Sequence, residues 1–333
     1  MRIPYEEMKS EFKRIFMEKG FNEESAEQAA TSFADNSCDG VYSHGVNRFP
    51  RVVQYIEKGY IKPNVKATKI GGLGALENWD GHLGLGSLIA KQCMDRAIDL
   101  ASQYGIGCVA IKNNNHWMRG GAYGWQAANA GCIGICWTNT QPNMPAWGAM
   151  DRRIGNNPLI MAIPRQKGHI VVDMAMSQYS YGKIEEYKLK NKDLPVPGGF
   201  DSNGAISTDP AEIEKTWRML PVGFWKGSSL SIVLDLISAV LSGGNTTADV
   251  GKLGGDEYAL SQVLIAIDPT KLNDSENIEK ALDESIEYIK SSLPVSEDGE
   301  IYYPGERAAF TREDNLKHGI PVDDEVWRQI TST

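Results

Sequence analysis

Residues 107–138 read GCVAIKNNNHWMRGGAYGWQAANAGCIGICWT, and this stretch decides the fold class. Its pattern predicts an apolar strand at 107–112, a helix at 122–130 and a second strand at 134–138, which together form a crossover unit of about thirty residues. The polar turn 113–116 leaves the carboxyl end of the first strand, where α/β proteins place their ligand sites. The sequence therefore predicts an α/β fold with a candidate site directly after this strand.

The same alternation of short apolar strands and helices continues on both sides of this unit, which supports the α/β class but does not give the strand pairing. A proline-containing segment, 187–211, is predicted to be a long loop that serves as a lid or an oligomer contact. The other strands are predicted at 68–70, 76–79, 159–163, 170–174 and 262–267, and the other helices at 86–104, 228–241 and 276–290.

The segment before residue 60 contains only helical patterns, at 5–19, 24–35 and 45–57. The last of these belongs to the run GVYSHGVNRFPR, residues 40–51, in which Ser43 is a natural N-cap. On that helix a polar stripe is expected to oppose a buried apolar face. The stripe consists of His44, Arg48, Arg51 and Tyr55, and the buried face of Val46, Phe49, Val52, Val53 and Ile56.

An acid/base group beside two fixed cations suits an anionic substrate that needs a proton, although a solvated charged stripe would show the same pattern. A histidine in the first turn of a helix releases its proton more easily, because the helix dipole disfavours the imidazolium form. His116 and Arg119 form a second such pair in the turn of the crossover unit, unless His116 merely caps the helix. Gly120-Gly121 before that helix would favour an anion, and Lys226 at a helix start would favour a phosphate unless it is only a surface lysine.

Composition excludes several classes of protein. The net charge of −9 and the lack of a Lys/Arg block argue against nucleic-acid binding, and the most apolar stretch, 230–241, is too short to span a membrane. The N-terminus lacks the apolar run of a signal peptide. Five cysteines without a C-x-x-C pair indicate reduced thiols in the cytoplasm. No metal-binding motif is present, so no metal site is expected.

Six motifs carry a family resemblance: YSHGVNR (42–48), NHWMRGGAYG (115–124), WTNT (137–140), IGNNP (154–158), VDMAMS (172–177) and PGER (304–307). Over essentially its whole length the chain resembles the malate/L-lactate dehydrogenase family, whose NAD(P)-dependent 2-oxoacid reductases lack the ordinary Rossmann fold. The resemblance implies a helical domain of residues 1–75 joined by 308–333, and a non-Rossmann NAD(P)-binding α/β domain of residues 76–307. It also explains why no G-x-G-x-x-G motif joins a strand to a helix.

Within the family, the chain is most similar to reductases of 2-oxo or 2,3-dioxo sugar acids that use NADH, with NADP(H) the less favoured cofactor. The resemblance implies that His44 donates the proton to the ketone and that Arg48 holds the substrate carboxylate, while His116 competes for the acid/base role. It also implies a homodimer. The implied cofactor contacts are His169, Ile170, Val171, Val172, Asp173, Met174, Ala175, Trp225, Lys226, Gly305, Glu306 and Arg307.

Two kinds of alternative stay open. The same His/Arg pair would serve an oxidoreductase of the family that acts on malate, lactate, ureidoglycolate or a cyclic imino acid. A protein of another class, a non-catalytic sugar-acid binder, would use the arginines without any cofactor.

Overall fold

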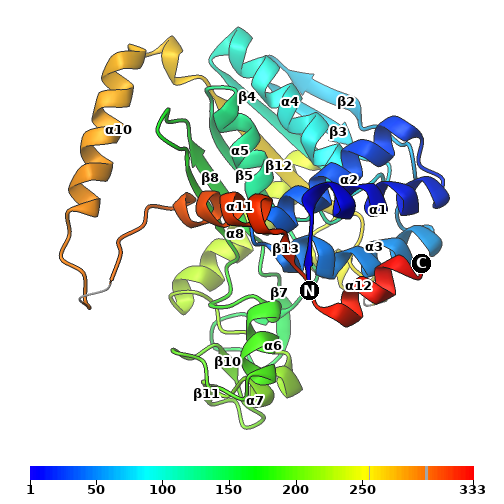
Figure 1. Cartoon of the computed structure of the whole chain (residues 1–333). Coiled ribbons are helices and arrows are strands. Elements are labelled where there is room, and N and C mark those ends of the chain that lie inside the picture. The colour runs from blue at the N-terminus through cyan, green and yellow to red at the C-terminus, as the bar shows by residue number, and fades with distance from the viewer. Residues whose placement is uncertain (255, 297–298) are drawn as a thin grey trace.

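In a computed structural model, which describes residues 1–254, 256–296 and 299–333, the chain folds around a mixed seven-stranded sheet (Figure 1). Neighbouring strands are antiparallel except for β3 and β4, which are parallel. The predicted α/β class is therefore confirmed. In spatial order the strands are β2 (Thr68–Leu73), β3 (Leu76–Asp80), β4 (Ile106–Asn114), β12 (Leu260–Ile267), β5 (Ile133–Thr138), β8 (Leu159–Ile163) and β9 (Ile170–Met174).

Helices cover both faces of this sheet. Helices α4 (Gly86–Tyr104) and α5 (Gly121–Asn129) pack on one face, and α8 (Trp225–Ser242) packs on the other. Side chains alternate along β4 accordingly, because Val109 and Ile111 join the core under α4 while Ala110 joins the core under α8. The predicted crossover unit is present, but β12 lies between its two strands and runs antiparallel to both.

The two ends of the chain form one helical part. Helices α1 (Tyr5–Glu18), α2 (Glu23–Cys38) and α3 (Phe49–Glu57) share a hydrophobic core with α12 (Asp324–Thr331), which contributes Trp327. Strand β1 (Arg2–Ile3) pairs with β13 (Ile320–Pro321), and Figure 1 shows the blue and red helices together. The predicted joining of the N-terminal helices with the C-terminal tail is confirmed.

Both predicted domain boundaries fall inside structural units. The boundary between residues 75 and 76 lies in the turn that joins β2 to its antiparallel partner β3, so the sheet begins at Thr68. The boundary after residue 307 lies inside α11 (Glu306–His318), which packs on α2. The sequence does not reveal these units, because the pairing of an exposed strand and the docking of a helix depend on contacts distant in sequence.

The predicted helix at 45–57 is shorter than expected. Two 3-10 turns, η1 (Tyr42–His44) and η2 (Val46–Arg48), precede α3, which begins at Phe49. Gly45, with φ −121° and ψ −119°, interrupts the helical backbone, and a proline near the helix start favours initiation at this point. Ser43 is therefore not the N-cap of this helix, although Val46, Phe49, Val52, Val53 and Ile56 are buried as predicted.

The segment predicted as a long loop is partly ordered. A short hairpin divides it, and helices begin and end it. Figure 1 shows this unit below the sheet and α10 standing apart from the sheet. The remaining elements are β6 (Met144–Pro145), β7 (Arg152–Ile154), α6 (Tyr181–Leu189), β10 (Gly199–Phe200), β11 (Ile206–Ser207), α7 (Pro210–Thr216), α9 (Thr247–Val250), η3 (Pro269–Lys271) and α10 (Ser275–Lys290).

Candidate active site

One edge of the sheet collects residues from three strands. Leu260 of β12 pairs with Asn114 of β4, and Gln262 pairs with Thr138 of β5. Because β4 and β5 run parallel and β12 runs against them, the residues that follow β4 and β5 lie at the same edge as those that precede β12. His116, Gln141 and Glu257 are such residues, and they meet there.

The turn after β4 holds His116 in one orientation. The Asn115 amide donates to the backbone carbonyls of Tyr60 and Gly84, at 2.9 and 2.8 Å. Met118 has a φ of +65°, rare for a residue with a side chain, and its N–H donates to His116 Nδ1 at 3.0 Å. Since Nδ1 is an acceptor, neutral His116 carries its proton on Nε2.

His44 reaches the same point from the helical part. The Asn36 side chain at the end of α2 donates to the His44 carbonyl at 3.0 Å, and the Val46 N–H donates to Ser37 Oγ at 2.9 Å. A Cβ on Gly45 would lie 2.2 Å from Ser37 Oγ, so only glycine allows the turn to pack on α2 this closely.

The two histidines, predicted as centres of separate constellations, form one site. Their rings stack with centroids 5.5 Å apart and planes 20° apart. Ser43, expected as a helix cap, is exposed, and its hydroxyl oxygen lies 3.1 Å from His44 Nδ1.

Both imidazoles are disposed to be neutral. Burial lowers the pKa of His44 from 6.5 to about 4, and the nearby guanidinium groups of Arg48 and Arg119 contribute. Burial also lowers the pKa of His116 well below its ordinary value, with further lowering by Arg48, His44 and Arg51. The dominant cause is desolvation rather than the helix dipole invoked from the sequence, since His44 precedes α3 instead of starting it.

The predicted stripe places two cations beside the histidines. Arg48 Nη2 lies 3.8 Å from Glu257 Oε1. Arg51 Nη2 donates to the Tyr55 hydroxyl at 3.0 Å, and Tyr55 itself is buried. The Glu257 backbone N–H also donates to that hydroxyl, at 3.2 Å, so the stripe is attached to the segment before β12.

Glu257 is the site residue that the sequence did not reveal. Its side chain is only 7% exposed, and its Oε1 lies 3.8 Å from His116 Nε2. The Gln141 N–H donates to its other carboxylate oxygen at 3.1 Å. No motif surrounds Glu257, because its position depends on β12 pairing with strands more than a hundred residues earlier.

The second predicted cation and the predicted anion seat are both occupied by the protein. Arg119 is buried and pairs with Asp39. Asp39 also accepts a hydrogen bond from Arg312 Nη1 at 2.8 Å. The Gly121 N–H donates to Asp173 Oδ2 at 2.7 Å. Arg119, expected as the cation of a second acid/base pair with His116, therefore instead joins the crossover unit to the helical part.

The residues assigned to the cofactor lie along β9 and next to its two ends. The Val171 N–H donates to the Pro304 carbonyl at 2.9 Å, which holds Gly305 beside the start of this strand. Just past its end, Met176 accepts a hydrogen bond from the Val222 N–H at 2.8 Å. The turn that contains Val222 leads directly into α8, where Trp225 and Lys226 are exposed.

The remaining assigned residues have various partners. His169 Nδ1 accepts from the Arg165 N–H at 3.1 Å. Glu306 is buried and pairs with Lys290. The Arg307 guanidinium lies 4.4 Å from the centroid of the Tyr302 ring.

Two observations at the start of β9 fit a bound group. The buried indole nitrogen of Trp125 has no hydrogen-bond partner among the described residues, and its ring centroid lies 5.6 Å from that of His169. Gly305 has a φ of +96°, and a Cβ there would lie 3.4 Å from the Trp125 ring and 3.2 Å from the Val171 nitrogen. An indole N–H without a partner among the residues that the structure describes, beside a glycine that places no side chain between Trp125 and Val171, suits a cofactor that lies against the strand.

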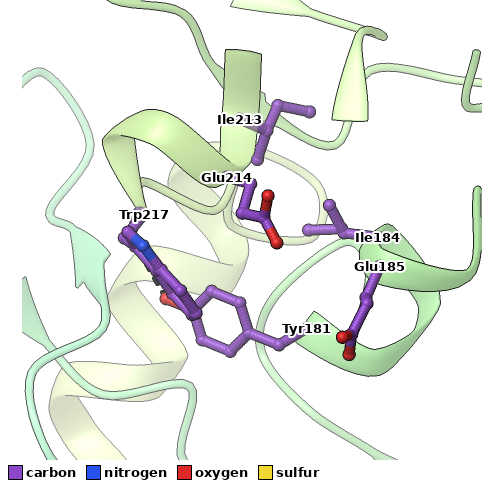
Figure 2. Close-up of a pocket in the computed structure, with 6 residues that line it drawn as sticks. All are labelled: Tyr181, Ile184, Glu185, Ile213, Glu214 and Trp217. Carbon is purple, nitrogen blue, oxygen red and sulfur yellow. Dashed lines mark hydrogen bonds between the residues drawn. The ribbon is translucent and has the colours of Figure 1, made fainter. Parts of the chain in front are cut away.

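A pocket of about 90 Å³ lies between α6 and α7. Figure 2 shows it lined by Tyr181 and Trp217 with Glu185 and Glu214, none of which was predicted as a site residue. Burial raises the pKa of Tyr181 to about 12, although Arg152 lowers it in part. In the described part of the chain, no group of three or more His, Cys, Asp or Glu could hold a metal ion.

Comparison with known proteins identifies the family of the chain. A family model described as malate/L-lactate dehydrogenase matches residues 3–331. The chain belongs to the malate/L-lactate dehydrogenase family. Members of this family are dehydrogenases or reductases that act on hydroxy or oxo acids, and their activity implies a nicotinamide cofactor.

The curated relatives are similar along the whole chain. A 2,3-diketo-L-gulonate reductase of Mannheimia succiniciproducens is 50% identical over 332 residues, which covers 100% of both chains. A 2,3-diketo-L-gulonate reductase of Haemophilus influenzae is 48% identical over 330 residues, 99% of both chains. These names agree with the resemblance to sugar-acid reductases, and the chain is a reductase of this family.

Solved structures share the fold. Sulfolactate dehydrogenase from Methanocaldococcus jannaschii is 30% identical with a TM-score of 0.89, covering 99% of this chain and 95% of that one. Malate dehydrogenase from Entamoeba histolytica is 25% identical with a TM-score of 0.93, covering 100% and 96%. The predicted non-Rossmann fold of this family is confirmed.

Proposed function

We propose that the protein reduces 2,3-diketo-L-gulonate, or a closely related 2-oxo sugar acid, to the hydroxy acid with NADH. The observation that carries this proposal is the convergence of His44, His116 and Arg48 at one edge of the sheet. The relatives that are about half identical over the full chain are named for this reaction.

The cofactor site of the proposal lies along β9, at the twelve residues assigned from the resemblance. When bound, the reduced nicotinamide supplies a hydride to the keto carbon. The carboxyl end of β9 belongs to the same edge of the sheet as His116, because Leu159 of β8 pairs with both Met174 and Trp137. NADH is preferred to NADPH in this proposal.

In the proposal, Arg48 and His44 act in sequence. Arg48 binds the substrate carboxylate, because a guanidinium matches a carboxylate with two parallel hydrogen bonds. The bound carboxylate offsets the positive charge of Arg48, which is one cause of the low pKa of His44. His44 then takes up a proton and donates it to the keto oxygen. His116, whose proton is on Nε2, is the competing donor.

Steady-state NADH oxidation tests the reaction and the donor together. A panel of 2-oxoacids that includes 2,3-diketo-L-gulonate should show this acid as the best substrate. His44→Asn should lower turnover by roughly 10²–10⁴-fold, the range for a lost general acid, and should leave NADH binding intact. A deeper loss in His116→Asn, with His44→Asn within a few-fold of the wild type, would reverse the assignment.

Other substrates of the family, and a binding protein without catalysis, remain the alternatives. Malate, lactate, ureidoglycolate and cyclic imino acids belong in the same panel, and a higher kcat/KM for any of them would replace the proposed substrate. A non-catalytic sugar-acid binder should not bind NADH. Trp125 lies beside the proposed cofactor site, so NADH should quench tryptophan fluorescence in the enzyme and not in such a binder.

We also propose that the enzyme is a cytoplasmic homodimer, on the basis of α8. This helix buries small or polar residues such as Ser231 and Ser238 and exposes an aliphatic face. It is long and apolar enough to cross a membrane, with 44% of it buried in the fold. A second copy would cover the exposed face without burying a charge. That face consists of Leu230, Ile232, Val233, Leu236, Ile237 and Val240.

Light scattering tests the dimer. Val240→Asp should yield a monomer. Leu73→Asp is the control, because Leu73 on β2 is about as exposed as Val240, and it should leave the mass unchanged. A wild-type protein that is monomeric, or that pellets with lipid vesicles, would contradict this part of the proposal.

A further inference from the structure

Glu257 places a negative charge at the centre of a site for an anion. Its carboxylate is buried, and one oxygen lies 3.8 Å from both Arg48 Nη2 and His116 Nε2. Both separations are too long for a hydrogen bond, so among the described residues this oxygen accepts none and could accept one from a donor on the substrate. The position adjoins both the proposed carboxylate anchor and one candidate acid.

The rest of the residue is fixed from two directions. The Gln141 N–H donates to the second carboxylate oxygen at 3.1 Å, and the Glu257 N–H donates to the Tyr55 hydroxyl at 3.2 Å. The neighbouring Asp256 pairs with Lys58 at 3.1 Å and lies close to Tyr55 and Tyr60. Because its backbone and one of its oxygens are held, Glu257 presents the other oxygen to the substrate as a fixed acceptor.

A fixed carboxylate beside Arg48 discriminates substrates by charge. An ionised carboxylate only accepts hydrogen bonds, so it binds a substrate hydroxyl and repels a second substrate carboxylate. The other cation of the stripe, Arg51, already donates to Tyr55 at 3.0 Å. A dicarboxylate would therefore bring one negative charge close to Glu257 in a partly buried, weakly screened site.

We propose that Glu257 is a specificity-determining residue that selects 2-oxo monocarboxylates with a hydroxylated chain and rejects dicarboxylates. The proposal rests on the proposed reduction of a 2-oxo acid at this site. It deepens that function, since the reaction chemistry alone would also admit oxaloacetate, the keto acid of malate.

The first experiment compares three 2-oxo acids in wild type and Glu257→Gln, a change that removes the charge and keeps the shape. Pyruvate, which has neither a hydroxyl nor a second carboxylate, is the reference that cancels general losses of activity. In Glu257→Gln, kcat/KM for oxaloacetate relative to pyruvate should rise at least tenfold. The ratio for 2,3-diketo-L-gulonate relative to pyruvate should fall.

Two variants serve as controls. Glu257→Asp keeps the charge and should retain the wild-type order of substrates. Asp256→Asn removes the neighbouring carboxylate, which pairs with Lys58, and should change neither ratio. Equal shifts in Asp256→Asn and Glu257→Gln would show a long-range effect of net charge and would overturn the proposal.

A second experiment uses only the wild-type enzyme, so it does not depend on whether a variant folds. Malate and its monoamide, in which an amide replaces the distal carboxylate, are compared as inhibitors of the wild-type enzyme. The monoamide should bind at least tenfold more tightly. Equal binding, or a preference for malate, would overturn the role of Glu257. If the wild type reduces no 2-oxo acid at all, the proposed function fails, whereas turnover with unchanged ratios in Glu257→Gln refutes this inference alone.

Discussion

Replacement of His44 by asparagine should make the folded protein less sensitive to acid. Burial lowers the pKa of His44 from 6.5 to about 4, so between these pH values the unfolded chain binds a proton that the folded chain does not. The free energy of unfolding therefore falls as the pH falls through this window. Asparagine cannot take up that proton, and the variant should lose this part of the pH dependence.

The size of the effect follows from the two pKa values. One pKa unit corresponds to about 1.4 kcal/mol, so the shift of His44 amounts to about 3 kcal/mol at its limit. Between pH 7 and pH 5 only part of this is realised, because the pKa of folded His44, about 4, lies below this interval. Integration over that interval gives about 2 kcal/mol of lost stability attributable to His44.

Urea unfolding at pH 7 and pH 5 measures this quantity. The drop in unfolding free energy between the two pH values should be about 2 kcal/mol smaller in His44→Asn than in the wild type. Comparing the drops cancels any pH-independent cost of the substitution. His82→Asn is the matched control, since His82 is exposed and has a φ of +50° that asparagine tolerates. Equal drops in wild type and His44→Asn would refute the assignment of a desolvated, neutral His44.

Three further predictions test the site. Arg48→Lys should lower kcat/KM for a 2-oxoacid about tenfold or more, Arg51→Lys should lower it less, and NADH binding should be unchanged in both. Equal losses in the two variants would show that Arg48 is not the main group that binds the substrate carboxylate. Lys226→Ala should raise the NADH dissociation constant roughly tenfold in a fluorescence titration and leave the melting temperature unchanged, and an unchanged constant would make it a surface lysine. Gly305→Ala should lower the free energy of unfolding in urea by about 1–2 kcal/mol, because the φ of +96° and a Cβ only 3.2 Å from the Val171 nitrogen both disfavour a side chain. An unchanged free energy of unfolding would count against the tight turn beside β9.

The strands of the sheet could be predicted because each is a local pattern. All seven predicted strands belong to the observed sheet, and α4 was predicted with its observed bounds, 86–104. Apolar runs between glycines and polar turns specify such elements without tertiary information. The pairing was beyond this reasoning, since β12 enters between β4 and β5 from a place more than a hundred residues later in the chain.

The candidate site divides in the same way. His44, Arg48 and His116 were found because each lies in a short motif that combines an acid/base group with a cation. The helix that was expected to carry the first two is replaced by 3-10 turns, because the strong apolar periodicity of residues 46–56 concealed the interruption at Gly45. Arg119 was misjudged, since its partner Asp39 is brought near only by the docking of the helical part on the sheet.

Strand order explains why the residues proposed for acid/base chemistry and for substrate selection come from such distant segments. His116 follows β4, Gln141 follows β5 and Glu257 precedes β12, and the antiparallel insertion of β12 brings all three to one edge. If β4 and β5 were direct neighbours, as in a simple crossover, Glu257 would have no route to His116. The helical part then completes the edge by adding His44 and Arg48, which lie on turns held by α2. In the proposed mechanism, substrate selection can therefore change through the segment before β12 while the two histidines proposed for acid/base chemistry, which lie on other segments, stay in place.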